Sequence, residues 1–400
     1  MRGLKRALVL AFGCLLATPL STLAATQHDS FSPSEHIVQG NEITLAFPAG
    51  KSPSKHLLLT LPSGLHLSYA EIITLGDFYQ VPEKPIYQGA TNEEKEVRFL
   101  ADFNLFAVSE ENVSEATGVI EIIYDELKSI DEAIANGEDA EAAYKRVSPD
   151  YNRRYNCATG GGCSASNWWL SPGKYLKVAK TNYDHFGDNA WVSYHVGHRL
   201  AIQAAVSARQ TEDVNKLAYA YAINAYASHF LSDRFASGHI RTPRVELAEQ
   251  VTPQDVGSLL ANYMHDEESS GGLHVHNGRG EQWIAYGDTT SFEAKCAPHR
   301  AKLIEALQLS ADEIYLAYAT GKSPDSKAVE NILPIADEIG SHAKDDISSL
   351  FFFEPTLKQV MRREKLDDFY DRHWTSNWWG WSTFTELERK RGLPLKASRS

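Results

Sequence analysis

The sequence of 400 residues predicts a mainly α-helical fold with a small β-containing segment near the N-terminus. After residue 90, apolar residues recur at helical spacing through most of the chain. Before that point, "EITLAF" (42–47) and "HLLLTL" (56–61) have the composition of short strands, and "PSG" marks a turn before "LHLSY". There is no internal repeat and no low-complexity linker, so we expect one main helical domain.

The helices are expected in a definite order along the chain. Thr91 can cap "TNEEKEVRFLADFNLFAV", which has early glutamates and then apolar residues at helical spacing. Two long helical patterns follow, "NAWVSYHVGHRLAIQAAVSA" and "TEDVNKLAYAYAINAYASHFLSD". Further helices are expected over 253–266, 291–319, 325–350 and 355–372, and a loop is expected over 267–290.

The first 25 residues are predicted to be an export signal rather than part of the fold. Three basic residues precede an apolar run, and "STLAA" offers small residues to a signal peptidase. Removal of this segment would lower the formal net charge from −13 to −16. No later apolar run approaches the roughly 20 residues that span a bilayer. We therefore expect an exported, soluble monomer, periplasmic or extracellular.

The remaining chain is divided by character into three parts. Residues 26–64 form the β-containing N-terminal segment, 65–350 the helical domain, and 351–400 an aromatic-rich C-terminal extension. Cys157 and Cys163 flank "ATGGG" and are predicted to form a disulfide in an oxidising compartment, with Cys296 left over. Three thiols with these spacings match no zinc–cysteine pattern. No nucleophile elbow, phosphate loop or H-E-x-x-H zinc helix is present.

The stretch "HFLSDRFASGHIR" (229–241) concentrates potential metal ligands. His229 and Asp233 stand four apart, which places them on one helix face about 5–6 Å apart. Gly238 permits a turn that can bring His239 back over the helix end. The alternative is a hydrogen-bonded core histidine with an acidic residue in the last turn, and this stretch alone does not decide between the two readings.

Other segments favour a metal site. "TNYDHFG" places His185 just before a predicted helix, and "NYMHDEESSGG" places His265 and Glu268 three apart on one helix face. Asp77 follows a glycine in an apolar setting, where a carboxylate usually needs a partner. Mixed histidine and carboxylate donors with few thiols suit Zn²⁺ best. We interpret these residues as a site for two or three zinc ions.

The order of these residues resembles that of bacterial zinc-dependent phospholipases C, whose superfamily also contains fungal zinc-dependent single-strand nucleases. The resemblance covers roughly residues 65–290 and is most specific at His229-x3-Asp233-x5-His239. It implies a mostly helical fold in which Asp233 bridges two metals, and Asp77 is a ligand and the candidate base. It implies imidazole ligands at His185, His229, His239 and His265.

This sequence departs from the family pattern in two places. The family's acid four residues after the last histidine is replaced by Ser269, so Glu268 or Asp266 would have to substitute. The family also uses an N-terminal tryptophan amine as a ligand, whereas cleavage here would leave Ala25 or Thr26. Three histidines could fill that place, and the sequence selects none of them: His36, His56 and His66.

The resemblance implies hydrolysis of phosphatidylcholine-type phospholipids to diacylglycerol and a phosphorylated headgroup by metal-activated water. Tryptophan clusters at 167–169 and 377–381 can hold a choline ammonium or sit at a lipid interface. Nucleases also use aromatic stacking. The negative charge favours a zwitterionic phospholipid over nucleic acid. The alternatives are a zinc phosphodiesterase or single-strand nuclease on the same scaffold, and a metal-stabilised binding protein without catalysis.

Other polar residues receive weaker assignments. His195 and His198 lie within a helical pattern and are expected to pack or to form hydrogen bonds behind the ligands. His274 and His276 are expected at the surface. Three arginines are candidates for binding phosphate oxygens: Arg234, Arg241 and Arg244.

Overall fold

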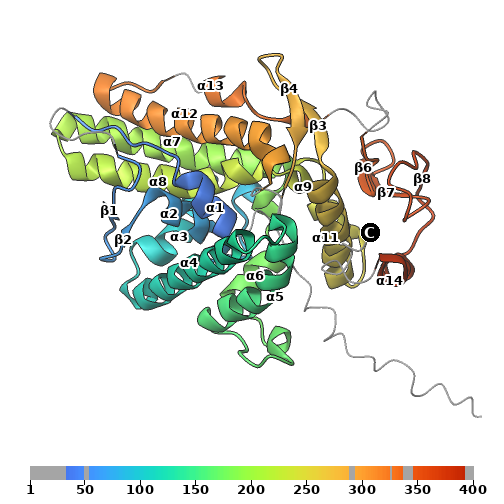
Figure 1. Cartoon of the computed structure of the whole chain (residues 1–400). Coiled ribbons are helices and arrows are strands. Elements are labelled where there is room, and N and C mark those ends of the chain that lie inside the picture. The colour runs from blue at the N-terminus through green and yellow to red at the C-terminus, as the bar shows by residue number, and fades with distance from the viewer. Residues whose placement is uncertain (1–32, 49–53, 288–292, 325–326, 337–345, 392–400) are drawn as a thin grey trace, which may run out of the picture.

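The computed structural model describes residues 33–48, 54–287, 293–324, 327–336 and 346–391 (Figure 1). The described chain is mainly helical with three small antiparallel sheets, which confirms the predicted fold class. Among these residues there is no helix of the length and apolarity that a membrane crossing requires. The predicted signal at 1–25 lies outside the described residues.

Three long helices form the centre of the molecule. They are α7 (Gly187–Thr211), α8 (Val214–Asp233) and α12 (Ala297–Thr320), and each packs on the other two (Figure 1). Residues 220–233 of α8 are all buried, and many of them are alanine or tyrosine. Small alanine side chains allow the neighbouring helices to approach closely. Both long helical patterns of the sequence are therefore confirmed, with α8 at the centre of the core.

The remaining helices surround this centre. α3 begins one residue after Thr91, whose side chain accepts a hydrogen bond from the backbone N–H of Glu94, as the sequence predicts. α1 and α2 pack together near α8, and α4 packs along α5 (Figure 1). Their bounds are α1 Pro33–Gly40, α2 Tyr69–Thr74, α3 Asn92–Ala107, α4 Val113–Ala135, α5 Ala140–Ala158, α6 Lys174–Lys180, α9 Ser237–Ile240, α10 Arg244–Gln250, α11 Gln254–Gly271, α13 Lys327–Glu330 and α14 Gly380–Arg391.

The strands are short and lie at the margins of the helical core. The first sheet pairs β1 (Leu59–Thr60) with β2 (His66–Leu67). The second has the order β4 (Gln282–Ala285), β3 (Leu273–His276), β5 (Ile335–Ala336). The third has the order β6 (Phe351–Glu354), β7 (Gln359–Arg363), β8 (Trp374–Thr375). The predicted strand at 42–47 reduces to a single bridge between Leu45 and Ser54, and that at 56–61 to β1.

Three sequence predictions in the C-terminal half are wrong. Residues 355–372 form a turn, the strand β7 and a loop instead of a helix, because Val360 of β7 and Phe351 and Phe353 of β6 pack against α10 and α11. Within 325–350, the described residues contain only α13 and β5; Pro334 cannot continue a helix. Residues 267–290 were expected as a loop, whereas α11 extends to Gly271 and β3 and β4 form a hairpin.

A buried ion-pair group fastens the C-terminal extension to α11. Glu267 accepts hydrogen bonds from Arg363, at 2.5 and 3.1 Å, and from Arg391 of α14 at 2.5 Å. The side chains of Arg363 and Glu267 are 0% and 3% exposed. Charges this deep in the protein are tolerated only when they are paired and hydrogen-bonded. The extension therefore packs on α11 through both a hydrophobic cluster and a buried salt bridge.

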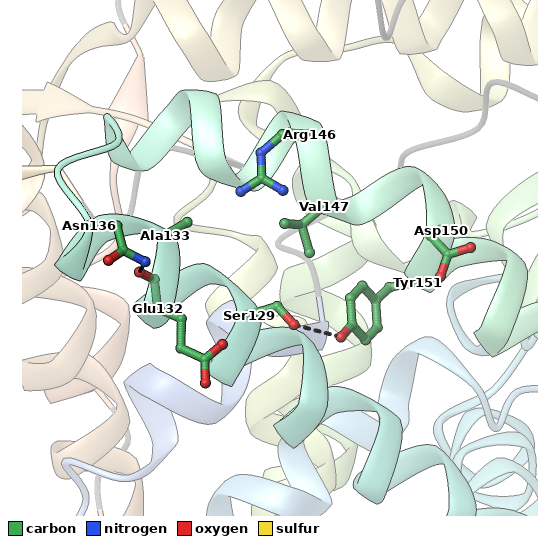
Figure 2. Close-up of a pocket in the computed structure, with 8 residues that line it drawn as sticks. All are labelled: Ser129, Glu132, Ala133, Asn136, Arg146, Val147, Asp150 and Tyr151. Atoms are coloured by element: carbon green, nitrogen blue, oxygen red, sulfur yellow. Dashed lines mark hydrogen bonds between the residues drawn. The ribbon is translucent and has the colours of Figure 1, made fainter.

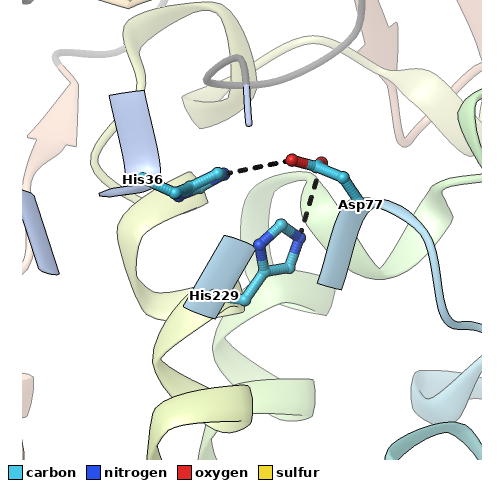
Figure 3. A group of neighbouring side chains, drawn as sticks. All are labelled: His36, Asp77 and His229. Carbon is cyan, nitrogen blue, oxygen red and sulfur yellow. Dashed lines mark ion pairs between the residues drawn. The ribbon is translucent and has the colours of Figure 1, made fainter. Parts of the chain in front are cut away.

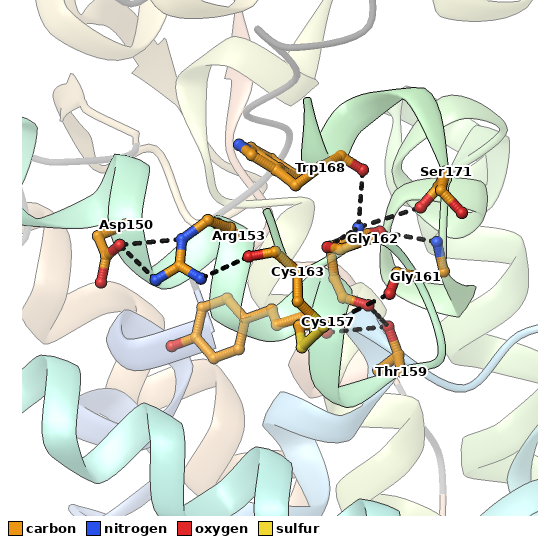
Figure 4. The surroundings of a disulfide bond; sticks show 12 residues. Asp150, Arg153, Cys157, Thr159, Gly161, Gly162, Cys163, Trp168 and Ser171 are labelled. Atoms are coloured by element: carbon orange, nitrogen blue, oxygen red, sulfur yellow. Dashed lines mark hydrogen bonds and ion pairs between the residues drawn. A yellow bond between two sulfur atoms is a disulfide. The ribbon is translucent and has the colours of Figure 1, made fainter. Parts of the chain in front are cut away.

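The predicted disulfide joins Cys157 in the last turn of α5 to Cys163 in the loop that follows (Figure 4). The Asn156 amide donates to the carbonyls of Gly162, Trp168 and Ser171, which folds the glycine-rich loop back onto the helix end. Cys296 is a buried thiol outside this bridge. The disulfide prediction is confirmed.

A separate surface cavity lies between α4 and α5 (Figure 2). Ser129 and Tyr151 are hydrogen-bonded on its wall, and Arg146 at its edge pairs with Glu138. None of its lining residues belongs to the predicted metal site.

Candidate metal centre

The end of α8 and the turn after α2 bring the first ligands together. His229 and Asp233 occupy the last two turns of α8, and both are fully buried. Asp77 ends the 3-10 turn Leu75–Asp77 and is 6% exposed. The preceding Gly76 allows this close approach, because a Cβ atom there would lie 2.2 Å from Cγ of His229. A glycine before Asp77 is thus required by the packing against the ligand helix.

Four donor atoms converge on one side of the centre. Nε2 of His229 lies 3.3 Å from Oδ2 of Asp233 and 3.8 Å from Oδ1 of Asp77. Nδ1 of His185 lies 2.7 Å from Oδ2 of Asp233 and 3.2 Å from Nε2 of His229. The other ring nitrogen of His185 lies 2.5 Å from the Gln80 amide. His185, His229 and Asp233 therefore form one group that could hold a metal ion, and Asp77 faces His229 from beside it.

His36 on α1 forms a second group with Asp77 and His229 (Figure 3). Its Nε2 lies 3.8 Å from Oδ2 of Asp77 and 3.6 Å from Oδ1 of Asp233. Each carboxylate thus offers one oxygen to His36 and the other to His229. The structure selects His36 from the three histidines that the sequence left open; His56 and His66 are exposed.

These donors fit a divalent cation. Zinc bonds of about 2.0–2.1 Å at tetrahedral angles place neighbouring ligand atoms about 3.3–3.4 Å apart. Most of the separations in the two groups are close to this spacing, at 3.2–3.8 Å. Among the described residues, neither oxygen of Asp233 has a hydrogen-bond partner, although both are buried. A cation would stabilise the ionised form of a carboxylate in this state. The buried His and Asp groups can therefore hold a metal ion.

The protonation of these groups follows from their burial. Burial, followed by the neighbouring His36, His185 and His239, lowers the pKa of His229 well below its ordinary value. Burial and the nearby His185 lower the pKa of His36 to about 3. Burial raises the pKa of Asp233 well above its ordinary value. His36 and His229 are consequently neutral, which is the form of an imidazole that binds metal.

His239 and His265 form an adjoining pair. Their ring centroids are 5.1 Å apart, and Phe186 stacks on His239 at 4.1 Å. Nδ1 of His239 lies 2.7 Å from the carbonyl oxygen of His185, and Nδ1 of His265 lies 3.0 Å from Oδ1 of Asp266. These contacts leave Nε2 of each ring as the ligand atom. Both histidines therefore lie beside the first two groups, as expected, with Asp266 behind His265.

Glu268 does not join a metal-ligating group among the described residues. Its Oε1 accepts a hydrogen bond from Nε of Arg241 at 2.8 Å, and Arg241 also donates to the carbonyl of Ile347. Burial raises the pKa of Glu268 to about 7, and Arg241 acts in the opposite direction. Position 269, which carries the acid in the resembled family, is a buried serine packed against Gly238 and Gly287.

The weaker assignments are also resolved. His198 is buried between Asn224 and Glu313, at 2.7 and 2.8 Å, in a polar network of the core. His274 is part of β3 rather than of a loop, and its side chain is 44% exposed. Arg244 donates to Asn182 and to carbonyls at the end of α6. Arg234 is 9% exposed, and its Nε and Nη1 have no hydrogen-bond partner in the described part of the chain.

Comparisons of the chain with protein-family models, with curated proteins and with solved structures found no match.

Proposed function

We propose that this protein is an exported zinc-dependent phospholipase C that hydrolyses phosphatidylcholine-type phospholipids to diacylglycerol and a phosphorylated headgroup. The observation that carries the proposal is the pair of carboxylates, Asp77 and Asp233, each directed at two groups of imidazoles. Two ions sharing such carboxylates would lie close together, as in enzymes that hydrolyse phosphate esters. Sequence resemblance supports the same chemistry.

The residues of the chain have separate tasks in this proposal. His36, His185, His229 and Asp233 hold the ions, which would neutralise phosphoryl oxygens and lower the pKa of a bound water. Asp77 keeps 6% exposure, whereas Asp233 has none. Asp77 is therefore better placed to accept the proton of a water that attacks phosphorus.

Charge and aromatic residues support a lipid substrate. A formal charge of −13 for the whole chain disfavours approach of a polyphosphate. Trp379 is 63% exposed and Tyr370 is 58% exposed, both in the C-terminal extension. Exposed aromatic rings of this kind can insert at a lipid–water interface.

Paired assays test the proposal. Hydrolysis of phosphatidylcholine micelles and of single-stranded DNA would be compared at matched zinc and ionic strength, with and without a chelator. We expect chelator-sensitive release of phosphocholine and a lower kcat/KM on DNA. Faster cleavage of DNA would show that the protein is a nuclease rather than a phospholipase C. A protein that binds zinc but hydrolyses neither substrate would favour the binding-protein alternative.

A further inference from the structure

Ser232 forms a hydrogen-bonded contact behind the His36 imidazole. It lies on α8 between His229 and Asp233 and is fully buried. Its Oγ lies 3.0 Å from Nδ1 of His36, 2.7 Å from the carbonyl oxygen of His229 and 3.1 Å from that of Ser228. The serine thus touches one candidate ligand on α1 while standing next to two others on α8.

The direction of the His36–Ser232 hydrogen bond follows from counting protons. A serine hydroxyl has one proton to donate and two lone pairs to accept. The carbonyl oxygens of α8 can only accept, and the closer one is at 2.7 Å. When the proton of Ser232 goes to that carbonyl, Nδ1 of His36 must be the donor to Oγ. The neutral ring then carries its proton on Nδ1 and its lone pair on Nε2.

We infer that Ser232 is a positioning residue that fixes the tautomer and ring orientation of His36. Nε2 is the nitrogen that faces Asp77 and Asp233, at 3.8 and 3.6 Å. Hydrogen bonds from the outer nitrogen of a ligating histidine commonly set its tautomer and orientation. The consequence for metal binding rests on the proposed function, whereas the tautomer itself does not.

His239 and His265 also have Nδ1 directed at a hydrogen-bond acceptor, but the acceptors differ from the serine hydroxyl. Nδ1 of His239 faces the His185 carbonyl and Nδ1 of His265 faces Asp266. A carbonyl or an ionised carboxylate can only accept, so their effect on the ring is unambiguous. Ser232 differs because it can also donate, and only the α8 carbonyls direct its proton away from His36. This makes Ser232 the position where the assignment can fail and can be tested.

Ser228 provides a matched control. It lies one turn earlier on α8 and is equally buried, but its Oγ contacts the Tyr69 hydroxyl at 2.9 Å instead of a candidate ligand. Ser232→Ala and Ser228→Ala remove the same atom from the same helix. The carbonyl of Ser228, which Ser232 also contacts, is retained in both variants. Thermal denaturation would show that both variants are folded.

The first measurement is the tautomer of His36 in metal-depleted protein. A long-range ¹H–¹⁵N spectrum of ¹⁵N-histidine protein, recorded where the ring is neutral, distinguishes the two forms, and His36→Ala assigns the signal. We expect the Nδ1–H tautomer in the wild type and in Ser228→Ala, and its loss or mixture in Ser232→Ala. An Nε2–H tautomer in the wild type would overturn the inference even if Ser232→Ala does not fold.

The second measurement is zinc affinity by competition with a chromophoric chelator. We expect Ser232→Ala to weaken binding of one ion by roughly 10–100-fold, the effect typical of lost outer hydrogen bonds. Ser228→Ala should match the wild type. Wild-type affinity in Ser232→Ala, together with weakened binding in His36→Ala, would overturn the positioning role. If the wild type binds no zinc at all, the proposed function fails, and the tautomer measurement still decides the role of Ser232.

Discussion

The candidate metal centre has two parts, in each of which the sequence places a histidine and an acidic residue on one helix, and the two parts differ in what those acidic residues contact. The carboxylate-rich part consists of two groups that share His229, and within each group the donor atoms lie within 4.8 Å of one another: His36, Asp77 and His229, and His185, His229 and Asp233. The carboxylate-poor part consists of His239 and His265, and its nearby acids are already engaged. Asp266 contacts Nδ1 of His265, and Glu268 forms an ion pair with Arg241.

The difference shows that a carboxylate near a histidine in sequence is not yet a ligand. Neither oxygen of Asp233 has a hydrogen-bond partner among the described residues, and its only charged neighbours in ion-pair range are histidines, so a bound cation would stabilise its ionised form. Glu268 already has a cation in Arg241, and the need for a metal is correspondingly smaller. We therefore expect the carboxylate-rich part to bind ions more tightly than the carboxylate-poor part.

The largest effect is expected at Asp233. Asp233→Asn removes the carboxylate that faces His185 and His229 through one oxygen and His36 through the other. We expect zinc content to fall by more than one ion per chain, and kcat/KM to fall by more than the roughly 10–100-fold typical of outer-shell changes. His274→Ala, at the partly exposed edge of β3, is the control and should remain active. Normal zinc content in Asp233→Asn would contradict this division of the centre.

His265→Ala should have an intermediate effect. The variant removes one of two imidazoles from the carboxylate-poor part and leaves the carboxylate-rich donors in place. We expect loss of at most one ion, measured by elemental analysis after dialysis, with the tighter ion or ions retained. Loss of all metal in His265→Ala would show that the two parts bind as one unit.

Gly76 allows a test through packing. Gly76→Ala would place a Cβ atom 2.2 Å from the His229 ring, and Gly118→Ala in α4 meets nothing within 4 Å. Overpacking of this kind costs about 1–3 kcal/mol, whereas an open helical glycine gains about 0.5–1 kcal/mol on change to alanine. We therefore expect thermal denaturation to give a lower Tm for Gly76→Ala and a higher Tm for Gly118→Ala than for the wild type. Equal Tm values would mean that α2 moves away from α8 without cost.

The last prediction concerns the pH dependence of stability that Glu268 causes. Burial raises its pKa from 4.5 to about 7, so the folded protein holds this proton more tightly than the unfolded chain. Its contribution to the free energy of unfolding is full below about pH 4.5 and is lost as pH rises to about 7, by up to about 3 kcal/mol. Metal-depleted Glu268→Gln should lack this decline in denaturant titrations. Parallel pH profiles in the two proteins would contradict the buried, metal-independent environment of Glu268.

The features that the sequence predicted correctly are those that depend on the pattern of residues close together in the chain. α3, α7 and α8 have regular helical periodicity and clear end signals, and His229 and Asp233 share a face because four residues complete about one turn. The helix expected over 355–372 was wrong because its apolar spacing is met equally by β7 packing on α10. Its strand partners, residues 351–354 and 374–375, are not recognisable from the segment itself.

The parts of the centre that the sequence did not determine depend on distant contacts. The sequence could not distinguish His36 from His56 and His66. The position of His36 depends on the packing of α1 beside α2 and on Ser232, which is 196 positions away. The spacing of His265 and Glu268 correctly predicted that both lie on one helix, but it could not show that Arg241 forms an ion pair with Glu268. A buried arginine partner is a tertiary contact with no local signature.

The salt bridge of Glu267 with Arg363 and Arg391 has a consequence for the integrity of the chain. Glu267 lies on α11, two residues from His265. The ion pair of Glu267 with Arg391 therefore holds α11 to α14, the last described helix of the molecule. A proteolytic cut ahead of β6 would leave a buried glutamate without its arginines beside the metal centre. Loss of the C-terminal extension is therefore expected to destabilise α11 and, where the candidate centre binds a metal ion, to weaken that binding as well.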